Sequence, residues 1–164
     1  HDINTDSGPS IMLAMVPNLY GDGVLRAVGA NHTNTAKMFP DAWPEAAYVL
    51  DIPADPKQPW PKTAITSGIK SVPGMPIAPM AAPGIFGAGD IDGDGDIDIL
   101  LSGDGDPRVF WLQQNGPGDF TQHVLEQDLG QAGGMLVVDL NGDGKNELVV
   151  TGYEDNKVYV YERN

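Results

Sequence analysis

Acidic side chains are concentrated in one stretch of nine residues. Residues 90–98 read Asp-Ile-Asp-Gly-Asp-Gly-Asp-Ile-Asp, so five carboxylates share one loop. Without a counter-charge these groups repel one another. Acidic side chains stand at loop positions 1, 3, 5 and 9, and a glycine stands at position 6. This pattern suits a hard cation that takes about six to eight oxygen ligands at roughly 2.3–2.6 Å. The stretch therefore predicts a Ca²⁺ site, and the alternative is a solvated turn without metal.

A second stretch repeats the pattern. Residues 139–147 read Asp-Leu-Asn-Gly-Asp-Gly-Lys-Asn-Glu, with oxygen-bearing side chains at the same positions. The first loop offers four carboxylates and the second offers three and an amide, so we expect tighter binding at the first. An EF-hand would need a bidentate glutamate at position 12, where Leu101 and Val150 stand. The expected side-chain ligands are Asp90, Asp92, Asp94 and Asp98 in the first loop, and Asp139, Asn141, Asp143 and Glu147 in the second.

A third, weaker copy lies upstream at residues 18–26. Its register matches that of the two clear loops, so Tyr20 occupies position 3 and Arg26 occupies position 9. An aromatic ring and a cation then replace two of the required oxygens. We therefore expect this loop to hold no metal.

The elements around the loops are predicted to be strands. Each clear loop follows a glycine-rich apolar run and precedes a β-branched run, after which a polar turn leads to a third run. The last copy lacks a fourth strand. The predicted strands are 11–16, 27–30, 47–51 and 62–66, then 84–88, 97–101, 108–112 and 119–125, then 133–138, 148–151 and 157–161.

Internal repetition organises nearly the whole chain, which we interpret as one domain spanning residues 1–164. The repeats cover approximately residues 11–69, 84–127 and 133–164. Their loops begin at residues 18, 90 and 139, and insertions at 31–45 and 70–83 account for the longer first interval. Periods of about 50 residues with four strands each are typical of propeller blades. The predicted fold is all-β, with three propeller blades.

Composition limits the partners. The 164 residues include 21 glycines and 14 prolines, which favours many short elements, and 41% are hydrophobic. The net charge of −14 would repel nucleic acid and anionic membranes, and two Ca²⁺ ions would reduce it only to −10.

There is no cysteine and no apolar run long enough to span a bilayer. The chain begins at His1 without a start methionine or signal sequence, so we expect it to be processed or excised. Low-affinity Ca²⁺ loops fill where the ion is abundant, which favours an extracellular or periplasmic location.

The two loops and their flanking residues resemble the FG-GAP or VCBS repeat family, which includes the integrin alpha-subunit propeller and many secreted bacterial proteins. Phe86 and Gly87 with residues 89–98, and residues 137–147, carry the resemblance, which covers roughly 84–164 and extends weakly to residue 11. It implies a Ca²⁺ ion in the hairpin between the first two strands of each blade. It also implies a backbone carbonyl ligand at position 7, from Asp96 and from Lys145.

The size of the chain departs from that family. Family rings usually have about seven blades, and three cannot close one. The chain is therefore expected to be part of a longer protein, to be completed by partner copies, or to stack into an open assembly.

The face opposite the Ca²⁺ hairpins is where the resemblance places ligands. A polar rim there is predicted for a glycan or protein ligand, although ordinary solvated turns would have the same sequence. Its residues are Asn31, His32, Asp104, Asp106, Arg108, Tyr153, Glu154 and Asp155. Residues 31–33 also fit the glycosylation sequon.

No catalytic residue is predicted, since the three histidines and few serines do not group with a partner. The predicted function is that of an extracellular Ca²⁺-stabilised module for ligand binding, adhesion or assembly. Two alternatives stay open. One is part of a secreted propeller enzyme, a lyase or hydrolase, and the other is a structural subunit of a surface fibre.

Overall fold

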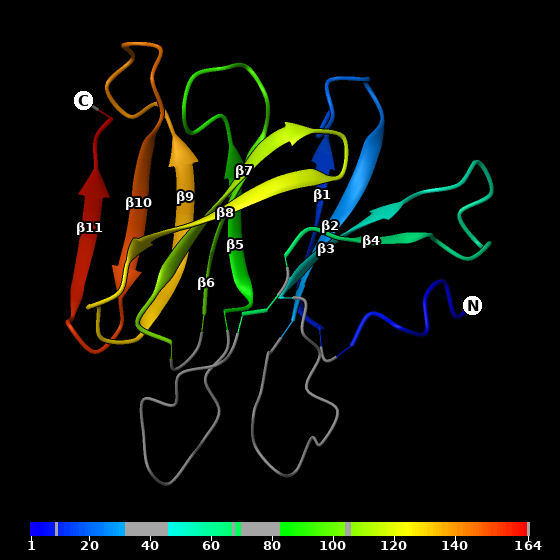
Figure 1. Ribbon diagram of the computed structural model, residues 1–164, viewed down its shortest axis with the longest axis horizontal. Coiled ribbons are helices and arrows are strands. Elements are labelled where there is room, and N and C mark those ends of the chain that lie inside the picture. The colour runs from blue at the N-terminus through cyan, green and yellow to red at the C-terminus, as the bar shows by residue number, and fades with distance from the viewer. Residues whose placement is uncertain (9, 32–45, 67, 70–82, 104–105, 164) are drawn as a thin grey trace, which may run out of the picture.

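The fold is all-β over the residues that the computed structural model describes, which are 1–8, 10–31, 46–66, 68–69, 83–103 and 106–163. These residues form three antiparallel sheets of four, four and three strands (Figure 1). No helix occurs among them, so none is present that has the length and apolar character of a membrane span. The all-β prediction is confirmed.

Each sheet is a meander of strands in chain order, as the repeats predicted. The third sheet has three strands, in agreement with the missing fourth run. The first sheet contains β1 (Ser10–Pro17), β2 (Leu25–Asn31), β3 (Ala47–Asp51) and β4 (Lys62–Ala64); the second contains β5 (Ile85–Gly89), β6 (Asp98–Ser102), β7 (Val109–Gly116) and β8 (Asp119–Glu126); the third contains β9 (Ala132–Val138), β10 (Glu147–Gly152) and β11 (Lys157–Tyr161).

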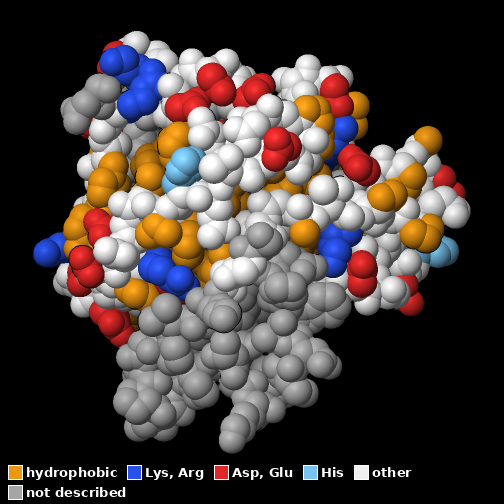
Figure 2. Space-filling view, viewed as in Figure 1, with side chains coloured by type: hydrophobic (Ala, Val, Ile, Leu, Met, Phe, Trp, Pro, Cys, Tyr) orange, Lys and Arg blue, Asp and Glu red, His pale blue; other side chains and the backbone are white. Residues whose placement is uncertain are grey.

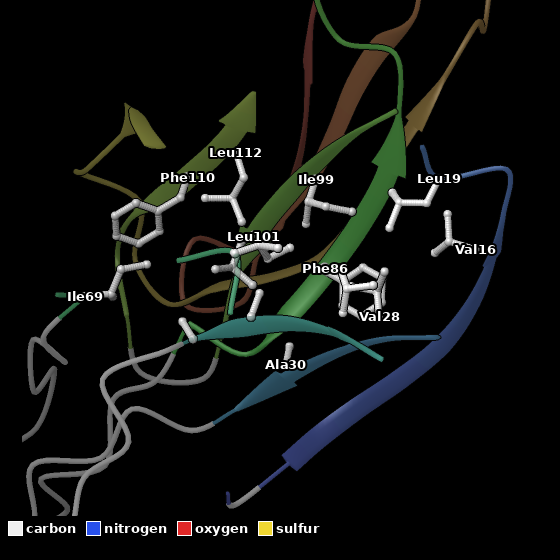
Figure 3. Close-up of a cluster of buried hydrophobic side chains, with 14 residues drawn as sticks. Val16, Leu19, Val28, Ala30, Ile69, Phe86, Ile99, Leu101, Phe110 and Leu112 are labelled. Atoms are coloured by element: carbon white, nitrogen blue, oxygen red, sulfur yellow. The ribbon is translucent and has the colours of Figure 1, made fainter. Parts of the chain in front are cut away.

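Apolar side chains fill both spaces between the sheets. The first and second sheets enclose one cluster, in which Val28 and Ala30 face Phe86, Leu101 and other side chains of the second sheet (Figure 3). The second and third sheets enclose another cluster. In the second sheet, its residues alternate along the strands with those of the first cluster, so the two sets point to opposite faces. The buried members of the second cluster include Leu100, Val109, Met135 and Val150. The second sheet is therefore apolar on both faces, as expected for a layer covered on both sides.

The outer faces of the first and third sheets differ in how well they are covered. Much of the first sheet is covered by its own chain, because Trp60 packs with Tyr48 and Leu50, and its backbone N–H donates to Ile3 O at 2.6 Å. The outer face of the third sheet is uncovered. There, Leu136 and Val158 are 60% and 65% exposed.

The second and third sheets approach most closely where β5 meets β9. Glycines at this contact leave room for the neighbouring backbone. A Cβ atom at Gly87 would lie 3.1 Å from Met135 O, and one at Gly89 would lie 2.7 Å from Val137 Cγ1 and 3.0 Å from Val137 Cβ. These glycines set the distance between the two sheets and, with it, the relative position of the loops that follow β5 and β9.

Substitution Gly89→Ala should destabilise the protein, because the added methyl overlaps Val137 in a packed interface. We expect a loss of about 1–3 kcal/mol in the free energy of unfolding, measured by urea denaturation. The additional change Val137→Ala should restore part of it. Gly134→Ala is the control, since its Cβ would meet nothing nearer than 3.9 Å. Equal losses for Gly89→Ala and Gly134→Ala would show that this close approach does not matter.

Candidate metal centre

Three hairpin loops, each joining the first two strands of a sheet, lie at the same end of the molecule (Figure 1). Acidic side chains gather along the corresponding edge of the surface (Figure 2). Glycines occupy positions 4 and 6 of every loop, and all six have positive φ angles, which other residues rarely adopt. The six are Gly21, Gly23, Gly93, Gly95, Gly142 and Gly144.

The side chain at position 1 organises each loop by accepting backbone hydrogen bonds. Asp90 accepts from the N–H groups of Gly93 at 2.5 Å and Gly95 at 3.1 Å. Asp139 accepts from the N–H groups at positions 4 and 6 of its own loop at 2.7 and 2.9 Å. Asn18 accepts the corresponding bond from Gly23 at 2.6 Å. The three loops therefore share the hydrogen bond from position 6 to the side chain at position 1, but the first loop differs at its start, where Asn18 has a positive φ angle and its backbone carbonyl accepts from Gly21 N.

Side chains at positions 3 and 5 continue the pattern in the two acidic loops. Asp92 Oδ1 accepts from Asp94 N at 3.2 Å, and Asp94 Oδ1 accepts from Asp96 N at 2.9 Å. In the other loop Asn141 and Asp143 accept the matching bonds at 2.9 and 2.8 Å. The local backbone thus fixes the side chains at positions 1, 3 and 5.

The carboxylate at position 9 closes each acidic loop from the first residue of the second strand. Asp98 Oδ2 accepts from Ile91 N at 3.0 Å, and Glu147 Oε2 accepts from Leu140 N at 2.7 Å. Both donors stand at position 2, so an aspartate and a longer glutamate make the same contact. Both carboxylates are buried, and Asp98 is 0% exposed.

Three of the predicted ligands converge. Oxygen atoms of Asp90, Asp92 and Asp98 lie within 4.8 Å of one another, which brings together positions 1, 3 and 9 of the second-sheet loop. Two oxygens that both bind one Ca²⁺ ion at 2.3–2.6 Å are separated by at most roughly 4.6–5.2 Å. The donor set and its spacing therefore fit Ca²⁺. Asp94, at position 5, lies outside this group, and among the described residues no such group of acidic side chains occurs in the loop of the third sheet.

Burial makes the Asp98 carboxylate costly to keep charged. Desolvation raises the pKa of Asp98, and the negative charge of Asp92 adds to the increase. The N–H groups of Gln114 and Ile91 act in the opposite direction but do not cancel it. No ion pair among the described residues brings a cation to Asp90, Asp92 or Asp98. A bound cation would supply the missing charge.

Sequence reasoning missed three residues that support the loops. Gln113 Nε2 donates to Asp92 Oδ2 at 2.7 Å, and the Gln114 backbone N–H donates to Asp98 Oδ1 at 2.8 Å. Asn146 Nδ2 donates to the Asp90 carbonyl at 2.8 Å, which links the two acidic loops across the sheet interface. The two glutamines follow the predicted third strand in β7, and no local pattern shows that they face the loop.

The loop of the first sheet carries its own cation. Arg26 donates to both carboxylate oxygens of Asp22, at 2.8 and 2.7 Å, and to Asp51 at 2.8 Å. The hydrogen bonds from Arg26 are the largest cause that lowers the pKa of Asp22 to about 2. A fixed guanidinium therefore compensates the acid of this loop.

The predicted register of the first loop is wrong by one residue. Leu25 pairs with Pro17, whereas Asp98 pairs with Gly89 and Glu147 with Val138. Residues 18–24 thus span the turn that residues 90–97 span in the second sheet. The residue equivalent to Asp98 is Leu25, not Arg26, because the first loop is one residue shorter after position 6.

Comparison with known families gives one match, which starts at the first ligand of the second-sheet loop. Residues 90–150 match the model of the FG-GAP-like repeat. Over this segment the chain is similar to FG-GAP-like repeats. The segment contains both acidic loops and extends into β10, as the sequence motifs predicted. Searches of curated proteins and of solved structures found no match.

The polar rim predicted on the face away from the loops of the FG-GAP-like repeat is only partly exposed. Asn31 is buried, and its side-chain amide donates to Ser7 O at 2.7 Å. The asparagine of the glycosylation sequon is therefore not at the surface. Asp106 is buried and bound by Arg108 at 2.6 Å. Asp155 accepts hydrogen bonds from Gly130 N and Tyr159.

Among the described members of that rim, only Tyr153 and Glu154 are exposed. His32 and Asp104 lie outside the described residues. Asn31 and Asp106 therefore lie inside the fold, and ligand binding by the other members stays a prediction.

The ion pair in the first loop should make a pH-dependent contribution to stability. Because the folded-state pKa of Asp22 is about 2, below its ordinary 3.8, the contribution is complete above about pH 4 and is lost as the pH falls toward 2. Arg26→Gln removes it. We therefore expect the difference in Tm between wild type and Arg26→Gln to shrink over that interval.

Lys57→Gln is the matched control, since it removes one positive charge from an exposed side chain. It should give a small difference in Tm that varies little with pH. A difference for Arg26→Gln that is the same at pH 2 and pH 6 would contradict the role of the Asp22 ion pair.

Proposed function

We propose that the chain is an extracellular Ca²⁺-binding module with two structural ion sites, one in each acidic loop. The observation that carries the proposal is the convergence of Asp90, Asp92 and Asp98 around a common point, with Asp98 buried. The second loop supports it by reproducing the same backbone hydrogen bonds with Asp139 and Glu147. When bound, the ion supplies positive charge to oxygens that otherwise repel one another.

A structural role is favoured over a catalytic one by where the loops stand. Each loop closes a hairpin, and its position 9 side chain is the first residue of a strand in a packed sheet. Asn146 joins the loop of the third sheet to the Asp90 carbonyl of the second. Neutralising the loops would therefore stabilise the hairpins and the interface between two sheets, because binding energy at such sites adds to folding energy.

We further propose that the three sheets are blades of a propeller. The supporting observations are the stacking of consecutive meanders of four, four and three strands and the lateral contact of their first strands, β1 with β5 and β5 with β9. The third sheet leaves Leu136, Val158 and Val160 exposed on its outer face. A further blade, from the same parent chain or a second copy, would cover this face.

An extracellular or periplasmic location follows from the same proposal. FG-GAP-like repeats are typical of extracellular proteins, and residues 90–150 match the model of that repeat. The net charge of −14 makes protein or glycan ligands better partners than nucleic acid. The module would then serve binding, adhesion or assembly.

Exchanging one ligand between the loops tests the proposal, because the chain itself contains both versions. Asp92→Asn gives the first loop the amide of the second, and Asn141→Asp gives the second loop the carboxylate of the first. We expect Asp92→Asn to weaken the tighter site by about tenfold and Asn141→Asp to strengthen the weaker site by a similar factor. Isothermal titration calorimetry of the metal-stripped protein with Ca²⁺ measures both.

Asp128→Asn is the control, because Asp128 is exposed and lies outside both loops. It changes the net charge by the same amount and should leave both affinities nearly unchanged. If wild type gives no binding heat, or if Asp128→Asn weakens binding as much as Asp92→Asn, the sites are not where we place them.

A further inference from the structure

Two strands of the second sheet, β7 and β8, place three side chains beside the acidic loop of residues 90–98. The two strands are the outer pair of that sheet and lie side by side (Figure 1). Trp111 of β7 is opposite His123 of β8 in the register. Gln113 lies two residues beyond Trp111 on β7, so the three side chains share one face of the sheet. We call them the β7–β8 cluster.

Gln113 joins this cluster to one of the predicted ion ligands. Its Nε2 donates to Asp92 Oδ2 at 2.7 Å, and its Oε1 lies 3.0 Å from His123 Nε2. Because an amide oxygen can only accept, His123 donates to it from a protonated Nε2. A flipped amide would bring its oxygen against the Asp92 carboxylate, so both contacts select the same orientation. The two bonds therefore run in one direction, from His123 through Gln113 to Asp92.

The bond from Gln113 leaves Asp92 able to bind an ion. The other oxygen of this carboxylate, Oδ1, accepts from Asp94 N at 3.2 Å. A carboxylate has about four lone-pair sites, so these two bonds leave about two for a cation. The contacts fix the direction of the side chain without using all of its oxygen ligands.

Trp111 lies near Asp98, the buried carboxylate of the same loop. Its ring stacks on that of His123, with centroids 4.7 Å apart and planes at 28°. Its indole N–H is buried and makes no hydrogen bond to any described residue. Burial raises the pKa of Asp98, and the indole N–H acts against that increase. The stack therefore places a polar group near Asp98 and also holds the imidazole that contacts Gln113.

The indole has no counterpart among the described residues of the third sheet. Trp111 pairs with Leu100, which stands two residues after the carboxylate that closes the first acidic loop. The matching pair beside the second acidic loop is Val160 with Val149. A valine side chain has no N–H to offer and no aromatic ring to stack. The two acidic loops therefore differ in the residues around them as well as in their ligands.

We propose that the β7–β8 cluster positions the ligands of the first ion site, in the loop of residues 90–98. Its members do not bind the ion. They hold Asp92 where its oxygens come within 4.8 Å of those of Asp90 and Asp98. Removing a group that orients a metal ligand from outside typically lowers metal affinity about 10–100-fold. This inference rests on the proposed ion sites and names the residues that tune one of them.

Gln113→Leu and Gln122→Leu are a matched pair for the test. Both remove one amide, but Gln122 is an exposed residue of β8. Ca²⁺ binding to the metal-stripped full chain is measured by isothermal titration calorimetry. We expect Gln113→Leu to weaken the first site by about tenfold and to leave the second site unchanged. Gln122→Leu should bind like wild type at both sites.

Two changes at His123 separate the hydrogen bond from the stack. His123→Phe keeps a ring on Trp111 but has no N–H for Gln113, whereas His123→Gln keeps a donor and loses the ring. We expect His123→Phe to weaken the first site more than His123→Gln does. His123 is only half-buried, so this pair tests the inference even if Gln113→Leu does not fold.

Terbium(III) in place of Ca²⁺ reports on the first site through Trp111, because bound terbium emits when a nearby indole passes energy to it. We expect tryptophan-excited terbium emission from the wild type and loss of most of it in Trp111→Phe. Ca²⁺ should displace this signal with the affinity of the first site, which assigns the calorimetric sites. Trp60→Phe is the control, since Trp60 packs with Tyr48 and Leu50 on the outer face of the first sheet.

Several results would overturn the inference. One is equal affinity of the first site in Gln113→Leu and Gln122→Leu, and another is equal weakening of both sites by Gln113→Leu. Equal affinities for His123→Phe and His123→Gln, or undiminished terbium emission from Trp111→Phe, would also do so. Any of these with Ca²⁺ binding by the wild type would refute this inference alone. No Ca²⁺ binding by the wild type would refute the proposed ion sites as well.

Discussion

Repulsion between carboxylates is the constraint on which the rest of the structure depends. Residues 90–98 hold five of them, and the fold brings oxygens of Asp90, Asp92 and Asp98 within 4.8 Å while burying Asp98 completely. Backbone N–H groups satisfy the oxygens as hydrogen-bond acceptors, but they do not cancel the charge. The loop is therefore preorganised in geometry, and the Arg163 guanidinium lies against Gly93, but no ion pair among the described residues reaches Asp90, Asp92 or Asp98. Because β6 begins at Asp98, and because Asn146 of the neighbouring loop holds the Asp90 carbonyl, the hairpin and the interface between the second and third sheets share that constraint.

The loop of the first sheet shows a second way of meeting the same constraint. It has the same glycines and the same bond from position 6 to position 1, yet it is one residue shorter and contains Arg26, whose guanidinium holds Asp22 and Asp51. Arg26 places a fixed positive charge beside the acid of this turn. Within one chain, equivalent hairpins thus use a side chain in one sheet and offer oxygen ligands in the other two. The contrast supports the proposal that the acidic loops bind a cation.

Much of this organisation could be predicted from the sequence because it is local and repeated. The two acidic loops, their glycines and the apolar runs that flank them predicted three sheets, the third with three strands. The predictions that failed depend on contacts between residues that lie far apart in the sequence. The shorter first loop is visible only in the pairing of Leu25 with Pro17, since a shared Gly-Asp-Gly run hides the deletion that follows it. Gln113, Gln114 and Asn146 support the loops from other strands and sheets, so no spacing in the sequence reveals them. Asn31 and Asp106 looked like surface polar residues, but tertiary packing buries both.

The central claim is that positive charge bound at the acidic loops stabilises the folded chain. The most direct test is the thermal unfolding of the metal-stripped protein in EGTA, compared with unfolding in Ca²⁺ at about 100 times its dissociation constant. A ligand that binds only the folded state adds about 2.7 kcal/mol per site at that concentration, so Tm should rise clearly in Ca²⁺ and return to its starting value on chelation. The same Tm in EGTA and in Ca²⁺ would contradict the account.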